Sequence, residues 1–172
     1  MKPQAHLITL LTTLAIAICP CVTASMRQNA DDAAIDAYIT SQAKLERGEE
    51  YREARKLVVG DLTRDGVPET VVLYTIEGQR GTNRSKQYLA VFARRTGKLT
   101  LLTHAEMGSK SVATVELRSV ENQVIMLDTL SYAPKDANCC PSVPGTMRYV
   151  VSGRTLREQK QGASTKMLPR YR

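Results

Sequence analysis

The chain has few of the residues on which catalytic and nucleic-acid-binding sites depend. Its 172 residues include no tryptophan, one phenylalanine and two histidines. Aromatic side chains on which bases could stack are therefore scarce, and no nucleic-acid-binding motif is present. A nucleophilic triad needs a base, and past the N-terminal segment only His104 could supply one. The sequence therefore predicts a protein that is not an enzyme and that has no nucleic-acid partner.

Cysteine is scarce too. The chain has four cysteines, and two of them lie in residues 1–24, a segment with the pattern of a secretory signal peptide. A positive start precedes the apolar run Leu7–Ile18, and small residues up to Ala24 offer a cleavage site. The run is well short of the ~20 residues that a membrane span needs. Neither Cys19 nor Cys21 follows the small residue that lipid attachment requires. We expect cleavage near Ala24, a periplasmic or secreted protein and no transmembrane span afterwards; a retained anchor is the alternative.

After the signal peptide, the pattern predicts a single domain over residues 25–162 and a basic flexible tail over residues 163–172. A helix is expected first, with Asn29 as its cap and Gly48 as its stop. Its face carries one narrow and mostly apolar stripe made of Ile35, Tyr38, Ile39 and Leu45.

Short runs rich in β-branched and aliphatic residues follow the helix, and turn dipeptides such as Asp65-Gly66 and Ser152-Gly153 separate some of them. The runs are Leu57–Val59, Thr70–Ile76, Gln87–Ala93, Leu99–Thr103, Ser111–Leu117, Val124–Leu130 and Met147–Val151, with Arg154–Glu158 as an optional eighth. Turns at such intervals are typical of an antiparallel meander. The predicted fold class is α+β and mostly β, with one N-terminal helix followed by an antiparallel sheet of about seven strands.

One of these turns, at residues 61–69, is acidic, and its shape could bring several oxygens onto a hard cation. This acidic turn resembles the calcium loops of FG-GAP and integrin-type β-propeller blades. The resemblance implies ligands from the side chains of Asp61, Thr63, Asp65 and Glu69 and from the carbonyl of Val67. Threonine replaces one strong ligand, so any calcium site would be weak. The favoured alternative is that the carboxylates hydrogen-bond the backbone of a tight turn. A whole propeller is not expected, because the chain has one such loop.

A wider resemblance covers the order of this turn, a hairpin at Tyr88–Leu99 and a late segment at Tyr132–Glu158. The order is similar to that of small exported bacterial proteins of unknown function. The late Asp-x-x-Cys-Cys-Pro-Ser motif, residues 136–142, is similar to that of the LppP/LprE-type lipoproteins of actinobacteria. The resemblance implies an envelope protein and brings no reaction with it.

Cys139 and Cys140 are neighbours and would be the only cysteines left after cleavage. Adjacent Cα atoms lie ~3.8 Å apart, below the ~4.4–6.8 Å usual for disulfides, so a bond between them is strained and easier to reduce. The pair could fix the connection between the sixth and seventh strands, with Asp136 and Ser142 as turn formers. It could also carry thiol–disulfide activity or crosslink two chains. We favour the structural turn, and a zinc site lacks enough ligands.

Positive charge is in excess, with a net charge of +7. The connection over residues 79–86, the basic loop, adds Arg80, Arg84 and Lys86 to this surface. Such a surface attracts anionic partners, including envelope components or another protein, although a merely solvated basic face is the simpler alternative. The sequence thus predicts an exported, non-catalytic binding or structural module. A weakly calcium-binding module and a thiol–disulfide active protein are the alternatives.

Overall fold

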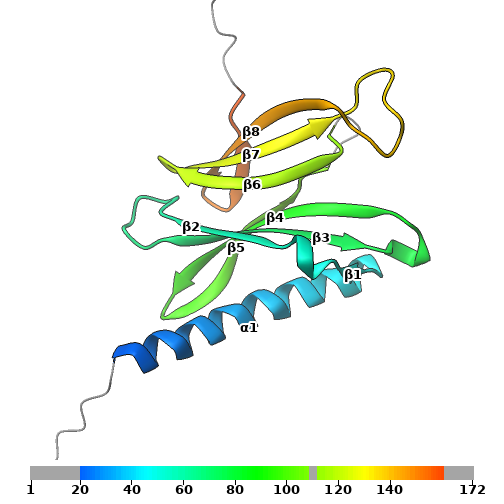
Figure 1. Ribbon diagram of the computed structural model, residues 1–172. Helices are drawn as coiled ribbons and strands as arrows, with labels where there is room; N and C mark the ends of the chain where they lie inside the picture. The colour runs from blue at the N-terminus through cyan, green and yellow to red at the C-terminus, as the bar shows by residue number, and fades with distance from the viewer. Residues whose placement is uncertain (1–19, 109–111, 161–172) are drawn as a thin grey trace, which may run out of the picture.

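The computed structural model describes residues 20–108 and 112–160 and confirms the α+β, mostly β fold class (Figure 1). Most of the predicted signal peptide and the predicted tail, residues 163–172, lie outside the described residues. The elements are α1 Pro20–Glu46, β1 Glu49–Glu50, the 3₁₀ turn η1 Arg52–Ala54, β2 Lys56–Gly60, β3 Glu69–Glu77, the 3₁₀ turn η2 Gln79–Gly81, β4 Ser85–Arg95, β5 Lys98–Glu106, β6 Thr114–Glu121, β7 Val124–Ser131, β8 Val143–Ser152 and β9 Thr155–Glu158.

The strands form two antiparallel sheets, whereas the sequence predicted a single sheet. In the first sheet β1 and β2 both pair with β3, which is followed by β4 and β5; the second runs β6-β7-β8-β9. Figure 1 shows α1 beneath the first sheet and the second sheet above it, so the molecule has three layers. Alternating patterns and short turns indicate which neighbouring strands pair. They do not reveal that the chain leaves one sheet after β5 and starts another.

Strand β3 lies in the middle layer and contributes to two separate cores. Val71 and Leu73 face the second sheet, whereas Val72 and Tyr74 face α1. All four are at most 2% exposed. A strand covered on both faces reads as a continuous apolar run, and the sequence of β3 does so.

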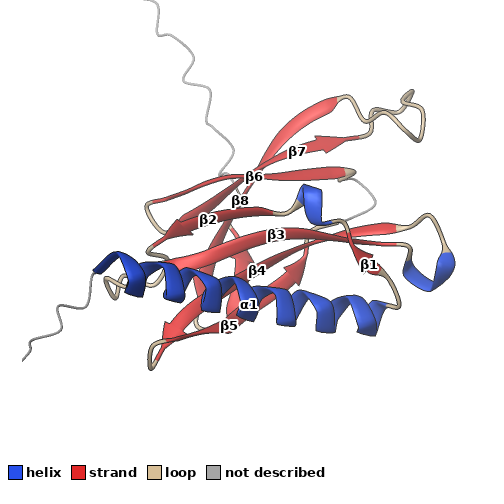
Figure 2. Ribbon diagram, turned by 60° about the horizontal axis from the view of Figure 1, so that its bottom comes forward, coloured by secondary structure: helices blue, strands red, loops and turns tan. Residues whose placement is uncertain are grey.

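Helix α1 lies along the outer face of the first sheet, as Figure 2 shows. Pro20, the first residue that the structure describes, is already helical, so the predicted start at Asn29 is wrong. No glycine interrupts the chain before Gly48, so the helix continues through Asn29. Ile39 is buried as predicted, but Leu45 is 75% exposed because it lies well off the buried face of the helix. Within the described residues, no helix has the length and apolarity needed to cross a membrane.

The two sheets come very close where β2 passes β6. A Cβ atom on Gly60 would lie 2.5 Å from Cγ1 of Val120, so only glycine fits there. Elsewhere the Gln87 side chain bridges the sheets, since its Nε2 donates to the Val115 carbonyl at 2.9 Å and its Oε1 accepts from the Val115 N–H at 2.8 Å. These contacts hold the two sheets in one arrangement.

Candidate functional site

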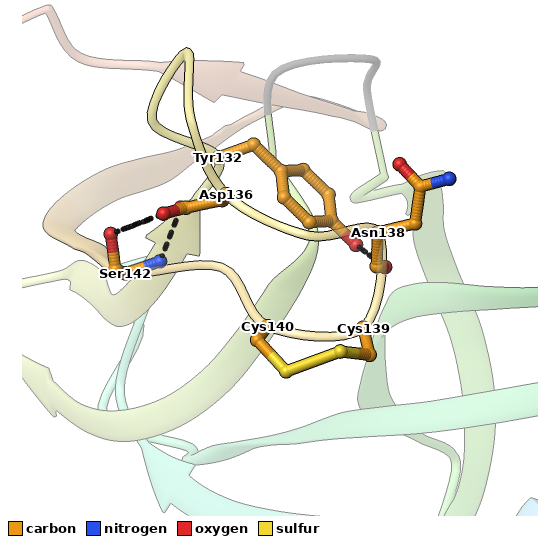
Figure 3. The surroundings of a disulfide bond; sticks show 6 residues. All are labelled: Tyr132, Asp136, Asn138, Cys139, Cys140 and Ser142. Atoms are coloured by element: carbon orange, nitrogen blue, oxygen red, sulfur yellow. Dashed lines mark hydrogen bonds between the residues drawn. A yellow bond between two sulfur atoms is a disulfide. The ribbon is translucent and has the colours of Figure 1, made fainter.

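The loop between β7 and β8, residues 132–142, projects from the second sheet and carries both cysteines (Figure 1). We call it the disulfide loop. Its organising group is the Asp136 carboxylate, which accepts the Ala133 N–H at 2.7 Å. It also accepts the Ser142 N–H at 2.9 Å (Figure 3). The Ser142 hydroxyl adds a bond at 2.9 Å. These donors, that of Ala133 first, lower the pKa of Asp136 below its usual value, so the carboxylate stays ionised. One side chain therefore joins the start of the loop to its end.

Cys139 and Cys140 form a vicinal disulfide at the exposed tip of this loop (Figure 3). The Cys140 N–H donates to the Ala137 carbonyl at 2.9 Å, which closes a turn around the pair. The Tyr132 hydroxyl donates to the Asn138 carbonyl at 2.6 Å. The predicted role of Asp136 as a turn former agrees with these contacts. Tyr132 was missed, because a tyrosine at a strand end carries no sequence signal for a loop contact.

The basic loop connects β3 to β4 and folds back onto the C-terminal end of α1. The Arg80 N–H donates to the Arg47 carbonyl at 2.8 Å, and the Gly78 N–H donates to the Arg84 carbonyl at 3.0 Å. Arg47 and Arg80 both have left-handed backbones, with φ of 54° and 55°. The side chains of Arg47, Arg80 and Arg84 are exposed, and none has a side-chain partner in the part of the chain that the structure describes. Arg47 was not expected from the sequence, because it lies outside the loop.

A hollow of about 350 Å³ opens between the basic loop and α1, and its lining includes Arg80, Arg84 and Lys86. The structure therefore brings the three predicted residues together. Lys86 differs from the arginines because its Nζ lies 3.1 Å from Glu106 Oε2 and 3.6 Å from Glu46 Oε2. The hydrogen bond that Lys86 donates to Glu106 raises the pKa of Lys86, which keeps the amine charged. The unpaired charge at this hollow thus comes from the two arginines.

The acidic turn lies at the opposite end of the first sheet, between β2 and β3. Asp61 accepts the N–H groups of Arg64 at 2.7 Å and Gly66 at 3.1 Å, and Asp65 accepts the Val67 N–H at 2.8 Å. These are the bonds of the structural alternative, in which the carboxylates hold the backbone of a tight turn.

Glu69 points into the molecule and is 2% exposed. Its Oε2 accepts the Leu62 N–H at 2.7 Å, and its Oε1 accepts the Thr63 hydroxyl at 3.2 Å. Across residues 20–108 and 112–160, no three His, Cys, Asp or Glu side chains gather as a metal site would require. Calcium binding at this turn stays a prediction, and the turn holds its shape through its own hydrogen bonds.

A group of aromatic side chains between α1 and the first sheet had no counterpart in the sequence predictions. The Tyr38 hydroxyl lies 2.6 Å from His104 Nδ1, and the Tyr38 ring meets those of Tyr74 and Phe92 edge-on. Tyr74 stacks on Tyr88 with centroids 5.4 Å apart. Burial raises the pKa of Tyr88 to about 12, so its hydroxyl stays protonated. His104 is exposed, and its contact with Tyr38 attaches α1 to β5.

The chain matches no protein-family model, and comparison with curated proteins and with solved structures finds no similar protein.

Proposed function

We propose that this protein is an exported, non-catalytic binding module that holds an anionic group of the cell envelope at its basic loop. The observation that carries the proposal is the pair of unpaired guanidinium groups, Arg80 and Arg84, at one hollow beside charged Lys86. Exposed guanidinium groups without internal partners are free to contact carboxylate or phosphate oxygens in two-pronged geometry.

The backbone around these arginines is held in place before any partner arrives. The bond from the Arg80 N–H to the Arg47 carbonyl joins the loop to α1. Gln79 is 8% exposed, and its Nε2 donates to the Ile76 carbonyl at 2.8 Å. A loop that is already ordered loses less conformational entropy on binding, so its contacts contribute more to affinity.

The charges at the other end of the molecule behave differently. Asp61, Asp65 and Glu69 are used as acceptors within their own turn. The Arg64 Nε donates to Gln123 Oε1 at 2.6 Å. Polar groups that are hydrogen-bonded to neighbouring residues stabilise the conformation of the turn. The guanidinium groups of Arg80 and Arg84 have no such structural role. The basic loop is therefore the better candidate for recognition.

The test compares two double variants that lose the same charge. Arg80→Ser with Arg84→Ser removes the proposed contacts, and Arg95→Ser with Lys98→Ser removes two exposed basic side chains from the β4–β5 turn at the other end. Each basic side chain near an anionic surface contributes about 1 kcal/mol, so losing two should make the first variant bind purified envelope fractions at low salt roughly thirtyfold more weakly than wild type. The second should bind like wild type. Equal losses would mean that net charge alone drives binding, and no loss in either would remove the proposal.

A further inference from the structure

We infer that Cys139 and Cys140 form a reversible two-electron site, at which a dithiol oxidoreductase of the same compartment exchanges electrons with this protein by direct thiol–disulfide exchange. The inference is independent of the basic loop, because it rests on the exposure of the disulfide, its small effect on the fold and the way its loop is held.

The first observation is access. Both cysteines are exposed, and the loop that carries them projects beyond the second sheet (Figure 1). Thiol–disulfide exchange requires an attacking thiolate to reach a sulfur, and exposed disulfides are the labile ones. A disulfide buried in either core would be protected from a protein-sized reductant. At the tip of a projecting loop, the dithiol of a second protein can reach Cys139 or Cys140 while both proteins stay folded.

The second observation is that this disulfide contributes little to the stability of the fold. Disulfide stabilisation grows with the length of chain that the bond encloses, because it comes largely from restricting the unfolded state. Cys139 and Cys140 are adjacent, so their bond encloses the shortest loop that a disulfide can close. It joins no two strands and spans neither core. Reduction should therefore leave the sheets intact.

The third observation is that the loop is held by bonds that do not involve sulfur. The Asp136 carboxylate joins Ala133 to Ser142. The Tyr132 hydroxyl holds the Asn138 carbonyl (Figure 3). All of these bonds can persist when the disulfide opens. Opening the ring therefore changes the tip of the loop, while the two ends stay where they are. This confines the redox change to the residues that a partner would contact.

The exchange proceeds in two balanced steps. A thiolate of the partner dithiol attacks one sulfur of the Cys139–Cys140 pair, the S–S bond breaks, and the departing sulfur takes its electron pair and then a proton from water. The second partner thiol, as thiolate, attacks the mixed disulfide and releases the remaining cysteine, which is protonated in turn. The partner ends as a disulfide and this protein as two thiols, with two electrons transferred. The reverse sequence reoxidises the pair.

The experiment equilibrates the exported form of the protein with mixtures of reduced and oxidised dithiothreitol, quenches with acid, alkylates and measures intact mass. We expect the two thiols to appear together in one transition, with a tenfold change in equilibrium constant per ~30 mV. A thioredoxin-type dithiol protein should reduce the pair in native buffer at least tenfold faster than the same concentration of glutathione. The oxidised and reduced forms should melt within about 2 °C of each other.

Two controls keep this test sharp. Cys140→Ser leaves Cys139 as a single thiol; its thiolate should attack the oxidised, disulfide form of the thioredoxin-type protein, release one partner thiol and form a mixed disulfide that acid quenching traps. Cys139→Ser with Cys140→Ser should form none, yet it should keep the melting temperature of the reduced wild type. The inference is overturned if the pair is reduced only when the protein unfolds, or if reduction lowers the melting temperature by more than about 5 °C.

Discussion

Replacing Glu69 by alanine removes the buried side chain that holds the acidic turn against the interior of the molecule. The Glu69 carboxylate is buried and accepts the Leu62 N–H at 2.7 Å and the Thr63 hydroxyl at 3.2 Å. Leu62 is itself 4% exposed, so water cannot readily reach its N–H once the carboxylate is gone. The variant therefore leaves a buried donor without an acceptor in the turn that follows β2.

The magnitude follows from two contributions. A buried donor left unsatisfied costs roughly 1–3 kcal/mol, and hydrogen bonds to charged groups lie at the upper end of that range. The truncated side chain also leaves a small space beside Leu62, which adds on the order of 1 kcal/mol. We expect Glu69→Ala to lower the free energy of unfolding by about 3 kcal/mol, which is a drop in melting temperature of roughly 10 °C for a domain of this size.

The conservative variant separates hydrogen bonding from charge. In Glu69→Gln, the amide oxygen can accept from the Leu62 N–H, and the amide nitrogen can donate to the Thr63 hydroxyl. Its loss should therefore be about 1 kcal/mol. Glu77→Ala is the matched control, because Glu77 is the exposed last residue of the same strand, and it should change stability by less than about 0.5 kcal/mol. Chemical denaturation in calcium-free buffer measures all three. The reasoning is refuted if Glu69→Ala behaves like Glu77→Ala, or if glutamine is as damaging as alanine.

Two further predictions concern packing and pH. Gly60→Ala should lower the free energy of unfolding by roughly 1–3 kcal/mol in a denaturant titration, because its Cβ would lie 2.5 Å from Val120 Cγ1. Gly108→Ala is the control and should be near neutral, because no atom lies within 4 Å of its Cβ. Asp36, whose pKa is lowered chiefly by its hydrogen bond from Arg55, stabilises the fold only while ionised. That contribution to stability is present above the unfolded-state pKa of about 4 and is lost as pH falls below it. Wild type should therefore melt at a higher temperature than Asp36→Asn at pH 7, and this difference should disappear toward about pH 2.

The sequence predicted the fold class because local patterns carry it. Short β-branched runs separated by turns define an antiparallel β-protein, and the pairing of neighbouring strands follows from those turns. The division into two sheets depends on contacts between residues far apart, such as Gly60 and Val120, and no local pattern records them. The continuous apolar run of β3 did carry a signal, because a strand covered on both faces must form the middle of three layers.

The candidate sites were predictable to different extents. Asp136 and Ser142 could be recognised as turn formers, because short polar side chains bond the nearby backbone. The inward direction of Glu69 could have been found from the period of two in β3, since Val71 and Leu73 face the second sheet and Glu69 shares their side. The contribution of Arg47 could not have been predicted from the sequence, because it depends on how the basic loop folds back onto α1.

The two ends of the molecule differ in how their polar groups are used, and this difference decides where binding should be sought. At the end with the acidic turn, Asp61 and Glu69 accept bonds from their own turn, so few groups are free to meet a partner. The other end carries both the basic loop and the disulfide loop (Figure 1). There the guanidinium groups of Arg80 and Arg84 and the exposed sulfurs have no structural role that the fold requires. Because the backbone beneath them is fixed by other residues, variants at this end should change binding or redox behaviour with little change in stability.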